Sequence, residues 1–177
     1  APIIRTILPQ QPVLMIDTRQ LDPADTLTFA AEFPQVPIIC TQAMWPQYAM
    51  LYKLLEERRN IYVETSFLHT YRTLEHLIHH FGADRVIFGA GPRSNNGAAI
   101  ASLMHAELSE EHREQIAGRN LAGLLGIPPA PCPTRTITGD GLWPRLLRRE
   151  RLGPEIIDAH AHLGRTGTWV VDSTDLP

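Results

Sequence analysis

Short apolar runs alternate with longer amphipathic stretches along the first 127 residues of the chain. The apolar runs are short and rich in residues that favour strands, and turn-forming residues flank them. Strands that are covered on both faces of a parallel sheet are apolar along most of their length. The pattern therefore predicts buried strands at 12–18, 36–42, 60–66 and 84–91.

Between these runs, apolar residues recur at three- and four-residue spacing, which is typical of helices with one buried face. Asp22 followed by Pro23, and later Ser109, are residues that begin helices, whereas Gly82 is typical of a helix end. Alternating strands and helices of this length indicate βα units on a parallel sheet, so the predicted fold class is α/β. The predicted helices are 22–33, 46–59, 71–81, 97–108 and 109–127.

The composition changes after the last of these helices. Residues 127–141 are rich in proline, which indicates a linker or a surface excursion, and 142–153 carry several arginines. This arginine-rich stretch is compatible with a short basic helix that contacts an acidic partner, or simply with a solvated helix face. We therefore place a Pro/Arg-rich linker at 128–154.

The stretch EIIDAHAHLG at 155–164 predicts one more buried strand, which carries two histidines. Alternate side chains of a strand share a face, so Asp158, His160 and His162 point to the same side. Two neighbouring imidazoles can ligate a divalent metal, which lowers the pKa of a bound water, but His-x-His is also compatible with ordinary histidines. His160 and His162 are the candidate metal ligands, and Asp158 would support the strand or orient a histidine.

Charge and composition narrow the class of protein. The formal net charge is −3, with 44% hydrophobic and 20% charged residues, as expected for a soluble globular protein that does not bind nucleic acid. The two cysteines, Cys40 and Cys132, form no disulfide framework or zinc spacing. We find no apolar run of membrane-spanning length and no secretory leader. The sequence therefore predicts a cytoplasmic protein without a membrane partner.

Several segments resemble a known family. In chain order, QPVLMIDTRQ, FPQVPIICTQAMW, RRNIYVETSF and GADRVIFGAGPRSN resemble strands five to eight of the metal-dependent amidohydrolase superfamily, especially its amidohydrolase-2 branch of decarboxylases and lactonase-like enzymes. LSEEHREQIAGRNLAGLLGI is similar to the terminal helices of that family, and IIDAHAHLG to its first strand. The resemblance implies a (β/α)8 TIM-barrel-type fold that is incomplete in this chain, with about four βα units and one extra strand.

This resemblance implies a domain organisation in which 1–127 are the C-terminal half of a degenerate barrel and 155–177 contain the first strand of a barrel. The chain would then span the junction of two tandem domains. Alternatively, the order is permuted and the extra strand pairs beside 84–91, because strands eight and one are neighbours in a closed barrel. The chain starts without Met, so we expect it to be processed or to be part of a longer protein.

The resemblance also implies a metal site built from the His-x-His strand, a histidine on strand five, a histidine on strand six and an aspartate on strand eight. In this chain the last three positions are Asp17, Gln42 and Gly91. Glutamine is a poor metal ligand and glycine has no side chain, although Asp17 remains a possible ligand. The first 127 residues are therefore expected to be a catalytically silent copy.

Two functions are compatible with these residues. The resemblance implies a metal-dependent hydrolase or decarboxylase that acts on a small molecule, with zinc as the expected metal. Catalytic zinc usually has three protein ligands, so the isolated chain is expected to be inactive. The alternative is a non-catalytic pseudo-enzyme half-barrel, which serves as a scaffold or partner of an active amidohydrolase domain or subunit.

Other polar residues are weaker candidates. His76 and His80 lie one turn apart on a predicted helix and can in principle bind a metal, but the apolar stripe of that helix places them, with His79, towards solvent. His69 follows the third strand, and Glu64 lies at its end without an apparent partner. The glycine-rich segment 89–97, which includes Arg93, is compatible with anion binding or with a tight turn.

Overall fold

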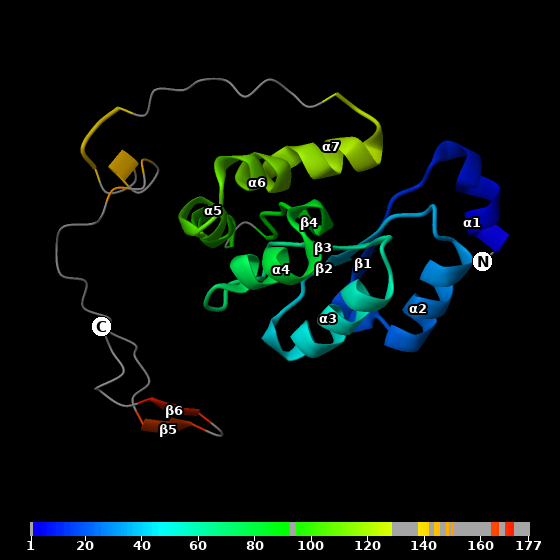
Figure 1. Cartoon of the computed structure of the whole chain (residues 1–177), viewed down its shortest axis with the longest axis horizontal. Coiled ribbons are helices and arrows are strands. Elements are labelled where there is room, and N and C mark those ends of the chain that lie inside the picture. Colours follow the sequence, from blue (N-terminus) through cyan, green and yellow to red (C-terminus); the bar gives the residue numbers. More distant parts are fainter. Residues whose placement is uncertain are drawn as a thin grey trace. The chain divides into compact units, whose positions relative to one another are not determined.

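The computed structural model of the chain describes residues 2–92, 95–128, 138–141, 144–145, 148, 150, 164–166 and 169–171 (Figure 1). The chain divides into two compact units, Ala1–Ile137 and Thr138–Pro177. In the second unit, strands β5 (Gly164–Thr166) and β6 (Trp169–Val171) form an antiparallel hairpin. The predicted strand at 155–164, except for its last residue, and the candidate ligands His160 and His162 lie outside the described residues.

The first unit is built on a four-stranded parallel sheet with the order β1-β2-β3-β4. Each predicted strand is present, in register with the next strand of the chain. The α/β prediction is confirmed, and an open sheet of four successive βα strands is consistent with an incomplete barrel. The strands are β1 (Leu14–Asp17), β2 (Ile38–Thr41), β3 (Ile61–Glu64) and β4 (Val86–Ile87).

Helices connect the strands and follow the last one. Asp22 caps its helix by accepting a hydrogen bond from the backbone N–H of Asp25 at 2.9 Å, and Ser109 does the same for His112 at 3.1 Å. None of the helices in the described part of the chain is both long and apolar enough to cross a membrane. The helices are α1 (Pro2–Ile7), α2 (Pro23–Glu32), α3 (Tyr48–Glu57), α4 (Thr73–Phe81), α5 (Asn96–His105), α6 (Glu110–Glu114) and α7 (Asn120–Leu125), with single 3-10 turns at Leu8–Gln10, Thr18–Gln20, Trp45–Gln47 and Ala83–Arg85.

Three elements differ from the sequence prediction. Helix α1 was not predicted, and the helix expected at 109–127 is divided into α6 and α7 by a π-helical turn, Gln115–Arg119. Strand β4 is much shorter than expected, because the backbone after it finds partners outside the sheet. The N–H of Phe88 donates to the carbonyl of Ile116 at 3.0 Å, and the N–H of Gly89 to the hydroxyl of Thr65 at 3.1 Å.

The core lies between the sheet and the helices α3 and α4. Alternate strand residues, including Ile38, Cys40, Ile61 and Val63, are fully buried against leucines of these two helices. In Figure 1, α2, α3 and α4 lie on one side of the sheet, and α6 and α7 lie on the other side. The sheet is therefore covered on both faces over part of its width, as its apolar strands require.

Buried side-chain donors close the amino-terminal end of the sheet. The amide nitrogen of Asn60 donates to the carbonyls of Ala30, Phe33 and Val36 at 3.1–3.2 Å, which ties the end of α2 to the start of β3. The guanidinium of Arg85 similarly donates to backbone carbonyls, including that of Ile61 at 2.7 Å, and burial lowers its pKa. These contacts give the carbonyls at this end of the sheet side-chain donors in addition to any backbone donors.

We expect Asn60→Ala to destabilise the first unit by about 1–3 kcal/mol, because it removes the hydrogen bonds that join the end of α2 and the loop after it to the start of β3. The change in the free energy of unfolding is measured by chemical denaturation of the full chain. Gln20→Ala removes an exposed amide and serves as the matched control, with an expected change below about 0.5 kcal/mol. Equal effects of the two substitutions would contradict this role of Asn60.

Candidate functional site

A pocket of about 470 Å³ opens where the carboxyl ends of the four strands meet. In parallel α/β folds this is the edge at which ligands bind. Much of the pocket wall is apolar, and Met15 is 67% exposed at its rim. The apolar lining comes from the strands, the loop after β4 and helix α7, and it consists of Met15, Ile39, Ile87, Phe88, Pro92 and Leu121.

Glu64, at the end of β3, is the ionisable residue of the pocket lining, and it is only 7% exposed. Its Oε1 accepts a hydrogen bond from the backbone N–H of Ser66 at 2.6 Å, and its Oε2 accepts one from the Ser66 hydroxyl at 2.7 Å. Both carboxyl oxygens of Glu64 are thus held by Ser66. Within the described part of the chain, Glu64 forms no ion pair with a cationic side chain.

The glycine at position 89 makes this placement possible. A Cβ atom on Gly89 would lie 1.7 Å from Oε1 of Glu64, so any larger residue would displace the carboxylate. The Thr65 hydroxyl holds the same glycine by accepting from its N–H at 3.1 Å and donating to its carbonyl at 3.3 Å. Glu64 was a candidate from the sequence, but its partner Ser66 was missed. The Glu-x-Ser spacing at the end of the strand is the sequence signal that could have identified this partner.

Asp17, at the end of β1, was a possible metal ligand from the sequence, but Arg19 engages its carboxylate. It caps the turn Thr18–Gln20 by accepting from the N–H of Arg19 at 2.9 Å. The guanidinium of Arg19 also donates to both carboxylate oxygens at 2.6–3.2 Å. These hydrogen bonds lower the pKa of Asp17 to about 2. A metal at this position would have to displace the arginine.

The other two metal positions also lack suitable groups. Gln42 adopts a left-handed backbone with φ +54°, and its carbonyl accepts from the hydroxyl of Thr18 at 3.1 Å. Gly91 has φ +63°, and a Cβ atom there would lie 2.7 Å from Cβ of Ser66. An aspartate at position 91 would therefore be strained and would collide with Ser66. No group of three or more His, Cys, Asp or Glu residues that could hold a metal ion occurs among the described residues.

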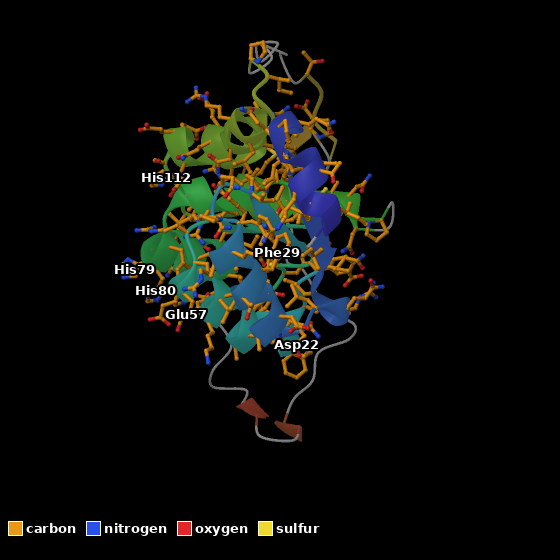
Figure 2. The ribbon with its side chains drawn as sticks, turned by 90° about the vertical axis from the view of Figure 1, so that its right-hand side faces the viewer. Asp22, Phe29, Glu57, His79, His80 and His112 are labelled. Carbon is orange, nitrogen blue, oxygen red and sulfur yellow. The ribbon has the colours of Figure 1, made fainter. Side chains whose placement is uncertain are left out.

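The other residues considered in the sequence analysis do not line this pocket or lie outside the described residues. As predicted, His76, His79 and His80 are on the exposed side of α4, and Figure 2 shows His79 and His80 at the surface. His69 is exposed, with Nε2 3.3 Å from the amide nitrogen of Asn95. Cys40 is buried in the core, where desolvation raises the pKa of its thiol to about 12, so it is not a nucleophile. Arg93 and Asp158 lie outside the described residues.

We expect the carboxylate of Asp17 to titrate near pH 2 in the folded chain, well below the usual value of about 4. Its ion pair then stabilises the fold fully above about pH 4, and this contribution is lost as the pH falls towards 2. Arg19→Gln should raise the pKa of Asp17 towards its usual value, as followed by carboxyl ¹³C NMR. Arg5→Gln, at a remote ion pair with Glu32, should leave this titration unchanged.

Gly91→Ala should destabilise the chain by about 1–3 kcal/mol, because alanine is strained at φ +63° and its Cβ would overlap Ser66. Gly123 in α7 provides the matched control, since a Cβ there would meet no atom within 4 Å. Gly123→Ala should stabilise the chain by about 0.5–1 kcal/mol. Thermal and chemical denaturation measure both variants. If Gly91→Ala leaves the stability of the chain unchanged, position 91 has room for a Cβ atom, and this description of the position is contradicted.

Comparison with solved structures finds partial similarity to decarboxylases. The chain is 18% identical to 5-carboxyvanillate decarboxylase from Sphingomonas paucimobilis, over 60% of this chain and 38% of that one, with a TM-score of 0.48. It is 21% identical to 2,6-dihydroxybenzoate decarboxylase, over 61% and 41% of the chains, with a TM-score of 0.46. A dihydroxybenzoic acid decarboxylase from Polaromonas with bound manganese and 2-nitroresorcinol is 22% identical, over 59% and 39%, with a TM-score of 0.45.

The chain thus spans about two fifths of the length of these solved structures. No curated protein sequence matches it. A family model, described as Amidohydrolase, matches residues 8–127, which include the four-stranded sheet and the helices from α2 to α7. Because this match covers more than half of the chain, the chain belongs to the amidohydrolase family.

Proposed function

We propose that the segment of residues 1–127 is a non-catalytic amidohydrolase half-barrel. It would act as a scaffold or partner for an active amidohydrolase domain or subunit. The observation that carries this proposal is the state of the three metal positions at the carboxyl ends of the strands. Asp17 is bound by Arg19, Gln42 offers only an amide, and Gly91 has no room for a side chain.

Coordination chemistry supports this assignment. A catalytic zinc usually requires three protein ligands, drawn from imidazole, thiolate or carboxylate groups. Glu64 is the one ionisable residue among the described residues that line the pocket, and a single carboxylate does not supply three ligands. The side chains at these positions therefore do not fit the metal site that the family resemblance implies.

The His-x-His motif at His160 and His162 motivates a second candidate function. A divalent metal, with zinc as the first choice, would be held by these two imidazoles and by ligands from a second domain or subunit. The reaction would be hydrolysis of a C–N or C–O bond, or decarboxylation, of a small molecule. The two candidates are compatible if the silent half-barrel is joined to an active barrel.

Metal analysis of the full chain tests these assignments. The chain is incubated with zinc or manganese, desalted and analysed by plasma mass spectrometry. The double variant Asp17→Asn/Gln42→Gly should retain the metal content of the wild-type chain, because neither side chain is a ligand. Loss of metal in this variant would contradict the non-catalytic assignment.

A second double variant, His160→Gln/His162→Gln, separates the two candidate functions. Metal that is bound by the wild-type chain and lost in this variant supports the metal-dependent enzyme. A wild-type chain that retains no metal gives no support to the metal-dependent enzyme. Gln20→Ala, an exposed position on the turn after β1, controls for losses during handling.

A further inference from the structure

The pocket at the carboxyl ends of the strands combines apolar walls with one buried carboxylate. Glu64 is 7% exposed, and the hydrogen bonds that it accepts come from Ser66, at 2.6 and 2.7 Å. A carboxylate offers about four lone-pair positions, so two remain for a further donor. Burying a charge is costly unless an opposite charge accompanies it. The described part of the chain provides no such cation for Glu64.

The position of the carboxylate is set by the fold and does not depend on a flexible side chain. Gly89 lies against Oε1 so closely that a Cβ atom there would be 1.7 Å away. Thr65 holds this glycine through two hydrogen bonds, and Ser66 holds both carboxylate oxygens. Glu64 therefore presents its free lone pairs from one fixed place in the pocket lining.

The rest of the pocket is suited to an apolar body of modest size. Its volume of about 470 Å³ is within the range of about 300–1,000 Å³ that small-molecule sites occupy. Met15 of β1 and Leu121 of α7 both contribute apolar side chains to the pocket lining, and Met15 is largely exposed in this structure. Methionine sulfur makes favourable contacts with aromatic rings.

We propose that this pocket binds a small organic ammonium ion with an apolar, aromatic body, with Glu64 as its anionic anchor. An ammonium group has three donors and no acceptor, which matches the free lone pairs of Glu64 and the hydroxyl oxygen of Ser66. The apolar body covers Met15 and Leu121. The same carboxylate repels ligands that carry a carboxylate. This inference rests on Glu64 and the apolar lining of the pocket, and it requires no metal.

The test compares three probes that share a phenyl ring: 2-phenylethylamine, 2-phenylethanol and phenylacetate. Binding to the full chain is followed by ¹⁵N NMR at the amides of Ser66 and Gly89, which border the carboxylate. The amine should bind about tenfold more tightly than the alcohol, because a charge-assisted hydrogen bond replaces a neutral one. Phenylacetate should not shift these amides. Equal affinity for the amine and the alcohol, or no response to the amine, overturns the proposal.

Two variants locate the anchor. Glu64→Gln should reduce the ratio of the affinities for the amine and the alcohol to about one. Met15→Ala should weaken the binding of both probes by a similar factor. Retention of the amine preference in a folded Glu64→Gln variant contradicts the proposal. If that variant does not fold, the probe comparison on the wild-type chain still decides the question. Failure of amine binding leaves the outcome of the metal analysis unchanged, so the two proposals are tested separately.

Discussion

The hydrogen bonds between Glu64 and Ser66 determine what the carboxyl edge of this sheet can hold. They fix a carboxylate against Gly89, and they place the side chain of Ser66 where a residue larger than glycine at position 91 would collide with it. The side-chain amide nitrogen of Asn95, beyond β4, also donates a hydrogen bond to the carbonyl of Ser66, just after β3, at 2.9 Å. The loops after β3 and β4 are thereby packed together, and position 91 has no room for a side chain.

This packing bears on Asp17, Gln42 and Gly91, the three positions at which the family resemblance led us to expect metal ligands. Once position 91 has no side chain, an aspartate at the end of β1 and a glutamine just after β2 do not supply the three ligands of a metal site. Asp17 is instead neutralised by Arg19, two residues further on. The buried carboxylate that remains lies in an apolar pocket, where a ligand with a positive charge would be favoured and an anionic one would not.

The sequence predicted the order and type of most elements, because their signals are local. Asp22 and Pro23 begin α2, Gly82 ends α4, and the apolar runs form the four strands. The early end of β4 was not predictable, since it depends on a carbonyl and a hydroxyl supplied by Ile116 and Thr65. The division of the last helix by a π-helical turn and the presence of α1 likewise had no clear sequence signal.

The site was predicted in part. Resemblance to the family identified the positions of Asp17, Gln42 and Gly91, but it did not reveal the ion pair with Arg19 or the collision at Ser66, which are contacts in space. Glu64 was noted without a partner, because hydrogen bonds to a residue two positions away depend on the exact path of the loop. His160 and His162 remain predictions from the sequence.

The most direct test of the central claim is a crystal structure of the full chain soaked in zinc, with anomalous scattering recorded at the zinc edge. The account predicts no anomalous peak at the carboxyl ends of β1 to β4, where Asp17 stays paired with Arg19 and Glu64 stays bonded to Ser66. A peak ligated by Asp17, Gln42 or Glu64 at that edge would show that the half-barrel holds a metal of its own and would contradict the account.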